Sequence, residues 1–432
     1  KLTRTFSADS NRKKFTVSVW VKKSQHASAK VIWGGEISTG YVWLNLGSTL
    51  YFQQNPSSTI EFNSTEKFRD ASGWYHIVQQ VDTAQATASN RMKFWVNGEQ
   101  ITSWATSTYP SQNEDIKFQS AAYPLRIGEF GNSYWDGSMS HFHWCDGYAY
   151  QASDFGETDA TTGEWKIKTS PSVSYGTNGF FILKDGNSVT DQSPNTNNFT
   201  VAAGNLTKTE DCPSNVFCTF NPLDTGTDTG SLLNGNTSYS QSQGDSIGTI
   251  MGTKGGKWYW EAKIGSGHGG AGANDSNYYF GACFLKENNT WATNHGAMGI
   301  CNGGNQSNTF ALYNNTGSGS ITQPSVSPPA AGTIVGIAVD MSGGTSSIKW
   351  FFNGTEVGSI TGITHTDFLG CTVVNQRFTG TATMRSIEYN FGNGYFGTTA
   401  VSSAGTNASN LGIFEYDVPS GHTALCTKGL NL

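Results

Sequence analysis

The stretch that decides the fold class is GTIVGIAVDMSGGTSSIKWFFNGTEVGSI, residues 332–360. Within it, Ile348, Trp350 and Phe352 occupy alternate positions, a spacing that is typical of a half-buried β-strand. Asn353-Gly354 follows directly, and this dipeptide readily adopts the two positive φ angles of a type I′ hairpin turn. The stretch therefore predicts strand, loop, strand, tight turn and strand.

The same pattern occurs earlier, in residues 74–101. A strand ends at Asp82, a polar loop follows, and RMKFWV (91–96) leads into Asn97-Gly98. Further short strands, with Gly, Asn and Ser between them, recur at sandwich-like spacing on either side of both stretches. We therefore predict an all-β fold with two antiparallel, jelly-roll-like β-sandwich domains in tandem and a loop-rich bridge.

Composition supports this fold class. A chain of 432 residues exceeds one hydrophobic core, so two or more domains are expected. With 52 Gly, 13% aromatic and 13% charged residues, the chain resembles a turn-rich β protein. The net charge is −6 and the sequence has no clusters of basic residues, while no apolar run approaches about 20 residues. We expect no nucleic-acid partner and no membrane insertion. Because Lys1 begins in mid-pattern, we also expect a preceding segment that hides any targeting signal.

The seven cysteines show no C-x-x-C spacing, which favours free thiols and folding in a reducing cytoplasm. Only Cys212 and Cys218 lie close enough in sequence to form a local disulfide bridge. The predicted domain boundaries are 1–165 and 231–398 for the two sandwiches, 166–230 for the bridge and 399–432 for a C-terminal tail. The Thr-, Gly- and Ser-rich residues 224–243 are expected to be loop or linker.

Several motifs resemble known families. FTVSVWVK, WYHIVQQVD, RMKFWVNGEQI and YWDGSMSHFHWCDGYAY resemble a concanavalin A-like (laminin-G-like) lectin domain. GKWYWEAKI, the GIAVD and KWFFNG strands and the late NFG resemble a SPRY domain. Together with the D-x-S-x-N-x-N turn at Asp191–Asn197, this combination resembles virion structural proteins of marine tailed bacteriophages.

That resemblance implies a non-enzymatic virion protein, a tail-fibre or surface-decoration subunit that adheres to host-surface polysaccharide. Its other implied partners are virion proteins and copies of itself, with a trimer as one expected form. Such a subunit would be assembled in the host cytoplasm and located in the virion. Two alternatives stay open: a purely architectural capsid or tail protein, and a polysaccharide depolymerase.

The sequence contains few candidates for catalysis. Glycosidases of this fold need two facing carboxylates, and residues 1–165 lack the E-x-D-x-E pattern. Glu415 and Asp417 alternate on a plausible strand, where a solvated face is the favoured interpretation. The G-x-S-x-G match at 244–248 lacks the flanking strand and helix of a nucleophile elbow, so we predict a turn. The glycine-rich 265–270 lacks a following helix and is expected to be a loop. We predict that the protein is not an enzyme.

The sequence offers two candidate metal sites. His141, His143 and Cys145 alternate along one strand and offer zinc-type ligands, although a polar strand face explains them equally. Asp136, Asp146 and Asp191 offer oxygen ligands for calcium. We predict no cofactor, with calcium as the open alternative.

Sugar-binding sites combine aromatic platforms with polar side chains on loops that a rigid sheet presents. Six residues fit this description, three in each predicted sandwich. The candidate carbohydrate-binding residues are Trp43, Tyr51, Trp135, Trp291, Asn294 and His295.

Overall fold

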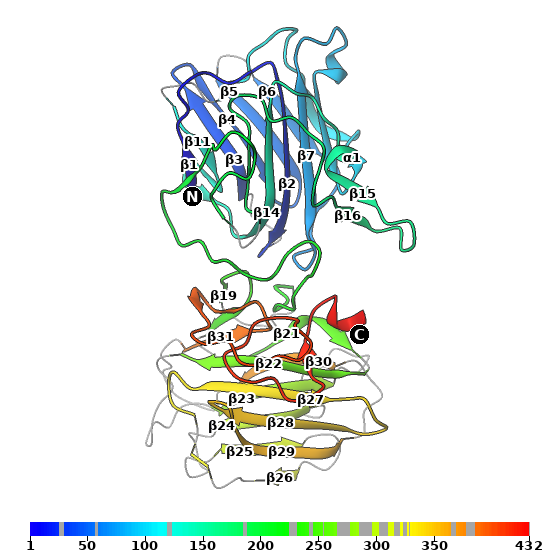
Figure 1. The fold of residues 1–432 in the computed structure, drawn as a ribbon, viewed down its shortest axis with the longest axis vertical. Helices are drawn as coiled ribbons and strands as arrows, with labels where there is room; N and C mark the ends of the chain where they lie inside the picture. Colours follow the sequence, from blue (N-terminus) through cyan, green and yellow to red (C-terminus); the bar gives the residue numbers. More distant parts are fainter. Residues whose placement is uncertain are drawn as a thin grey trace. The chain divides into compact units, whose positions relative to one another are not determined.

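The computed structural model is built almost entirely of antiparallel β-strands (Figure 1), which confirms the predicted all-β class. The one parallel pairing among the described strands joins β22 to β34. No helix in the described part of the chain is long and apolar enough to cross a membrane. The structure describes residues 1–25, 30–56, 59–118, 123–184, 188–223, 231–241, 245–253, 255–265, 277–284, 296–301, 310–314, 320–322, 326–327, 329–363, 369–376 and 385–431.

The chain forms two compact units, and their limits differ from the predicted domain boundaries. The first unit contains Lys1–Lys208 and Cys212–Ser214, and the second contains Thr209–Asp211 and Asn215–Leu432. Most of the expected bridge therefore belongs to the first unit, because its short strands pair with that unit's strands. The predicted linker contains a hairpin, β19 and β20, which pairs with β31.

Two sheets face each other in the first unit. In the described residues the larger has eight strands, in the order β10 (Trp104–Thr108), β6 (Ile60–Ser64), β5 (Leu50–Pro56), β4 (Gly40–Leu46), β3 (Lys30–Ile37), β11 (Leu125–Ile127), β1 (Leu2–Arg4) and β18 (Thr200–Val201). The smaller has six, β17 (Phe180–Ile182), β14 (Gly137–Asp146), β2 (Lys14–Lys23), β7 (Tyr75–Asp82), β8 (Met92–Val96) and β9 (Glu99–Gln100). The remaining elements are short: η1 (Ala88–Asn90), β12 (Glu129–Phe130), β13 (Ser133–Tyr134), α1 (Ala152–Phe155), β15 (Gly156–Thr158) and β16 (Trp165–Ile167).

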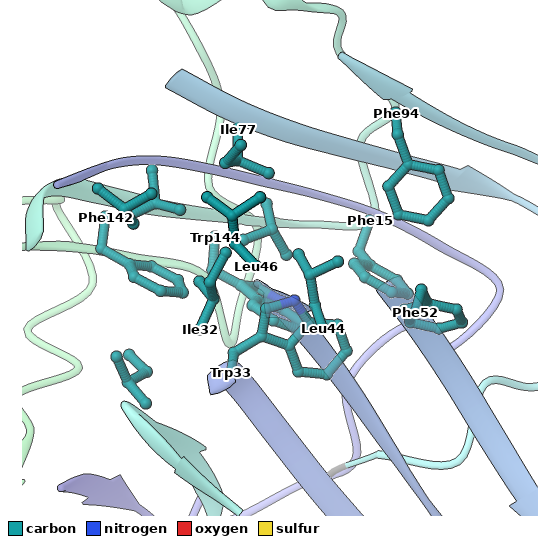
Figure 2. Close-up of a cluster of buried hydrophobic side chains, with 14 of the residues drawn as sticks. Phe15, Ile32, Trp33, Leu44, Leu46, Phe52, Ile77, Phe94, Phe142 and Trp144 are labelled. Atoms are coloured by element: carbon teal, nitrogen blue, oxygen red, sulfur yellow. The ribbon is translucent and has the colours of Figure 1, made fainter. Parts of the chain in front are cut away.

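Aromatic rings fill the space between these two sheets (Figure 2). Trp33 of β3 meets Trp144 of β14 edge-on, with 5.1 Å between ring centroids. Phe15 of β2 stacks on Trp144 at 5.0 Å. Each ring removes roughly 150–250 Å² from water, so this cluster supplies much of the hydrophobic stabilisation of the first unit.

Both Asn-Gly turns adopt the predicted geometry. Asn97 and Gly98 have φ angles of 49° and 84°, and Asn353 and Gly354 have 46° and 81°. Positive φ at both central positions is the signature of a type I′ turn, so this prediction is confirmed.

The smaller sheet of the first unit is covered on its outer face as well. A second apolar cluster there joins Val78 and Trp95 of the sheet to Ala152 and Phe155 of α1. In Figure 1, α1 and the β15–β16 hairpin lie beside the strands β2, β7 and β14. The central strand β2 is consequently buried along nearly its whole length.

His76 attaches this outer layer, α1 and the β15–β16 hairpin, to the sheet by hydrogen bonds. The indole Nε1–H of Trp165 donates to His76 Nδ1 at 3.0 Å, and His76 Nε2 lies 2.8 Å from the Ser18 hydroxyl. An indole N–H can only donate, so Nδ1 must be the acceptor and the ring is neutral. Burial agrees with this state, since it lowers the pKa of His76 to about 3.

The second unit is also a two-sheet sandwich. In its described residues the first sheet runs β19 (Ser231–Leu233), β20 (Ser238–Gln241), β31 (Arg385–Asn390), β22 (Lys257–Ile264), β27 (Ile334–Asp340), β28 (Ser346–Phe352) and β29 (Thr355–Ile363), with β34 (Thr423–Ala424) beside β22. The second runs β21 (Asp245–Thr253), β30 (Leu369–Gln376), β23 (Asn277–Phe284), β24 (Gly296–Cys301), β25 (Phe310–Asn314) and β26 (Ser320–Thr322). Short elements follow: β32 (Tyr395–Phe396), β33 (Thr399–Ala400) and η2 (Gly429–Asn431).

The predicted C-terminal tail covers the outer face of the first sheet of this sandwich. Phe414, Ala424 and Cys426 pack with Tyr259 and Ala338 on the outer face of the first sheet. The tail is therefore part of the second unit's core rather than an appendage.

One buried carboxylate anchors that tail. Glu261 of β22 is fully buried and accepts the backbone N–H groups of Glu415 and Tyr416, both at 2.9 Å. The hydroxyl of Tyr259 and the amide of Asn390 also donate to it, at 3.2 and 3.3 Å. Burial nevertheless dominates and raises the pKa of Glu261 to about 7.

We expect the second unit to lose stability as pH rises from about 4.5 to about 7, because folded Glu261 then holds a proton that the unfolded chain has released. The change in unfolding free energy from this group is about 3 kcal/mol. Glu261→Gln should abolish the slope and, by losing an acceptor, lower stability at pH 5. Denaturant unfolding across this pH range measures both effects.

The matched control is Glu356→Gln, which changes a half-exposed carboxylate paired with Lys349 on the same unit. It should leave the slope intact. An unchanged pH dependence in Glu261→Gln would show that another group is responsible.

Candidate functional site

The outer face of the eight-stranded sheet in the first unit carries an ordered set of aromatic and amide side chains. On β4, Val42 and Leu44 point into the core, so the alternate residues Tyr41, Trp43 and Asn45 lie on the outer face. The neighbouring strands β5 and β6 follow the same alternation. We call the resulting set the aromatic–amide patch: Tyr41, Trp43, Asn45, Tyr51, Gln53 and Asn63.

Strand register places two of the predicted sugar-binding residues together in this patch. Trp43 pairs with Gln53, and Asn45 pairs with Tyr51. Trp43 and Tyr51 are thus diagonal neighbours on one face, about 7–8 Å apart between Cα atoms. Both side chains therefore lie on the outer face of the sheet, on adjacent strands.

A hairpin borders the patch on the side of β3. Phe130 of the β12–β13 hairpin lies over Gly34, where even a Cβ atom would come within 2.7 Å of it. Its ring lies 5.6 Å from Trp43 and 5.7 Å from Tyr41, and the Arg126 guanidinium lies 5.3 Å from its centroid. Sequence reasoning missed this hairpin, because its position depends on the missing side chain of Gly34.

Three polar atoms of the patch lack a hydrogen-bond partner among the described residues: Trp43 Nε1, Asn45 Oδ1 and Asn63 Oδ1. Unpaired polar atoms that are shielded from water cost free energy. All three atoms are shielded from solvent, so the surface that this face offers to a ligand is formed by the exposed parts of Trp43, Tyr51 and Gln53.

The carboxylates on this face are held apart. Glu36 of β3 forms an ion pair with Arg126 at 2.6 Å, while Glu61 of β6 accepts the Tyr51 hydroxyl at 3.0 Å. Burial and this hydrogen bond raise the pKa of Tyr51 to about 12. Because β4 and β5 lie between β3 and β6, the strands that carry the two carboxylates are separated by roughly 14 Å. A glycosidase pair needs at most about 9.5 Å.

The other predicted sugar-binding residues do not join the patch. Trp135 is partly buried and packs against the hydrophobic core of the first unit, and its role as a binding platform stays a prediction. Trp291, Asn294 and His295 lie outside the described residues.

The structure explains His141, His143 and Cys145 without a metal. His141 has φ 48° beside a bulge in β14, which breaks the simple alternation. His143 is buried, stacks on Phe181 at 3.9 Å and lies 2.9 Å from the Tyr175 hydroxyl. Cys145 is buried in the outer cluster. The expected polar face is therefore an interior surface, and burial lowers the pKa of His143 while it raises that of Cys145.

Asp191 organises the D-x-S-x-N-x-N turn. Its Oδ1 accepts the N–H groups of Phe181 and Ser193, both at 2.8 Å. Its Oδ2 accepts the Ser193 hydroxyl at 2.8 Å and the N–H of Asn197 at 2.7 Å. A carboxylate offers about four lone-pair directions, and this chain occupies all of them. We therefore expect Asp191 to hold this turn rather than to bind calcium.

The amides of the same turn tie distant segments together. Asn195 donates to the carbonyl of Gly176, and Asn197 donates to that of Gly179 at 2.8 Å. Arg4 of β1 in turn donates to Asn197 Oδ1 at 2.7 Å. The motif thus links the first strand of the unit to its last segment.

Asp136 and Asp146 do not gather with it. Asp146 accepts the N–H groups of Asn11 and Asn178 at 2.7 and 3.2 Å, and burial raises its pKa. Asp136 uses its backbone carbonyl to accept the N–H of Ser24. Among the described residues, no group of three or more His, Cys, Asp or Glu side chains could hold a metal ion.

The remaining motifs serve the fold. Glu415 and Asp417 lie in an irregular segment rather than on the expected strand, where Glu415 accepts the N–H of Ser402 at 2.7 Å and Asp417 that of Thr406 at 2.6 Å. Residues 245–248 lie within β21, so the predicted turn is wrong there. Residues 266–270 lie outside the described residues. Cys145, Cys212, Cys218 and Cys426 are free thiols, so Cys212 and Cys218 form no bridge.

Comparison with known proteins bears on the first unit. Residues 3–153 match the family model of the concanavalin A-like lectin/glucanases superfamily. The predicted lectin-like domain is thereby confirmed for this segment, which contains the whole aromatic–amide patch. No curated protein matches the chain.

Three solved structures are similar to the chain at low sequence identity. The SPRY domain of human HERC1 is 14% identical, with coverage of 39% of this chain and 96% of that one and a TM-score of 0.28. A heptameric SAP-like pentraxin from Limulus polyphemus is 15% identical, with 35% and 71% covered and a TM-score of 0.26. Domains LG4-5 of the mouse laminin alpha1 chain are 10% identical, with 90% and 84% covered and a TM-score of 0.27.

Because Asp191 has no free lone pair, neither calcium nor EDTA should change the melting temperature of the first unit. Asp191→Ala should instead destabilise it by roughly 3 kcal/mol or more, since four buried donors lose their acceptor. Thermal unfolding followed by circular dichroism measures both. A calcium-dependent rise of several degrees in the wild-type chain would contradict this assignment.

Proposed function

We propose that the protein is a non-enzymatic adhesion protein that binds carbohydrate on the aromatic–amide patch of its first unit. The observation that carries this proposal is the juxtaposition of Trp43, Tyr51 and Gln53 on the outer face of one sheet. The match of residues 3–153 to a superfamily named for lectins and glucanases supports the same class of ligand.

The spacing of the carboxylates supports binding over hydrolysis. Glu36 and Glu61 each interact with a neighbouring side chain, and they are too far apart to act on one glycosidic bond. The depolymerase alternative is tested by incubating the chain with polysaccharides that it binds. Release of reducing ends would overturn the non-enzymatic part of the proposal.

We place this adhesion protein on a bacteriophage virion, as a tail-fibre or surface-decoration subunit that binds host-surface polysaccharide. The support is the resemblance of its sequence motifs to phage structural proteins. A homo-oligomer such as a trimer would convert weak single-site binding into useful avidity. Labelled antibody and electron microscopy of intact particles test the location. Labelled particles that bind no host polysaccharide would favour the purely architectural alternative.

Trp43→Ala should weaken binding to neutral glycans on an array by about 10-fold or more, because it removes the aromatic contact surface. Gln53→Ala should weaken it less, and this variant preserves the core. Leu206→Ala is the matched control, since Leu206 is 38% exposed on the same unit and lies outside the patch. Equal binding by Trp43→Ala and the control would rule out the patch as the site.

A further inference from the structure

A separate cleft of about 470 Å³ lies at one end of the six-stranded sheet in the first unit. Its lining residues come from the beginning of β2, the end of β7, the beginning of β8 and the segment after β14: Lys14, Gln80, Asp82, Gln85, Asn90, Lys93, Gly147, Tyr148 and Ala149. This volume falls within the roughly 300–1,000 Å³ of small-molecule sites. The cleft and the aromatic–amide patch are built from different sheets.

Hydrogen bonds hold one wall of the cleft. The Thr16 hydroxyl donates to the carbonyl of Tyr148 at 2.9 Å and accepts the N–H of Tyr150 at 2.8 Å. The Gln80 amide donates to the carbonyl of Tyr150 at 3.0 Å. The segment that carries Tyr148 is thereby fixed on the sheet.

The opposite wall is held by Arg91. Its guanidinium donates to the carbonyls of Gln85 and Ala86, both at 2.8 Å, and to that of Pro110 at 3.0 Å. The Arg91 guanidinium thus holds the loop between β7 and β8 in one conformation. Both walls are ordered before any ligand binds, which lowers the entropic cost of binding.

The charged side chains that line the cleft differ in the partners they have within the chain. Asp82 is 6% exposed, and its Oδ2 accepts from Lys14 and Gln85, both at 3.0 Å. Its Oδ1 has no hydrogen-bond partner among the described residues, but it is shielded from solvent and so lies out of a ligand's reach. Lys93 has no ion pair or side-chain hydrogen bond among the described residues. The cleft therefore offers a ligand one cation that no described residue pairs.

Tyr148 adds an aromatic surface. Its side chain is 41% exposed, and its ring is stacked nearly parallel on Tyr150, with 5.8 Å between centroids and 11° between planes. A stacked pair presents one fixed ring face. The negative π face attracts the weakly positive C–H edges of a pyranose ring.

We propose that this cleft binds an acidic sugar unit, a pyranose that carries one carboxylate. The carboxylate pairs with the Lys93 ammonium, and one ring face lies on Tyr148. The two lysines outnumber the single aspartate, so the lining carries net positive charge on a chain of net charge −6.

Titration calorimetry on the full chain tests this with methyl glucuronide as the probe. Methyl glucoside, which lacks the carboxylate, should bind about 10-fold more weakly or not at all. Acetate, which lacks the ring, should also bind more weakly. Lys93→Ala and Tyr148→Ala should each weaken glucuronide binding by about 10-fold or more.

The matched control is Lys67→Ala, since Lys67 is an exposed lysine of the same unit outside the cleft. This variant and Trp43→Ala should bind the glucuronide normally, which separates failure of the cleft from failure of the patch. Near-ultraviolet circular dichroism confirms that each variant is folded. Equal affinity for the two methyl glycosides, or full binding by folded Lys93→Ala, would overturn the proposal.

Discussion

The constraint on which this structure depends is that its central strands are buried on both faces. β2 is buried along nearly its whole length, and β22 is buried similarly. A sandwich covers only one face of each sheet, so the other face needs a second layer. In the first unit α1 and the β15–β16 hairpin supply it, and in the second unit the C-terminal segment does so.

Each cover is attached by polar groups that are themselves buried. Neutral His76 links Trp165 to the sheet of the first unit, and Glu261 links the backbone at Glu415 and Tyr416 to that of the second. Such groups stabilise one arrangement of the cover because any shift leaves a donor or acceptor unpaired. They also make the cover sensitive to pH, since burial displaces both pKa values.

The covers determine where ligands can bind on the first unit. They occupy the middle of the six-stranded sheet, which leaves a cleft at the end where Lys14, Asp82 and Lys93 meet. The outer face of the eight-stranded sheet instead presents Trp43 and Tyr51 among amides. One sheet thus offers an open aromatic surface, and the other a small charged cleft. We propose that they bind sugars of different charge, because rigid strands fix the spacing of the side chains in each.

The sequence by itself determined the all-β class, both type I′ turns and the lectin-like character of residues 3–153, because alternation and Asn-Gly geometry are local properties. It also singled out Trp43 and Tyr51. Only the tertiary structure decided that His143 and Cys145 face an interior, and that three backbone N–H groups and one hydroxyl donate to Asp191. These outcomes depend on segments that are distant in sequence. For His143, these segments contribute Phe181 and Tyr175. A local sequence pattern does not indicate which distant segment will cover a given face.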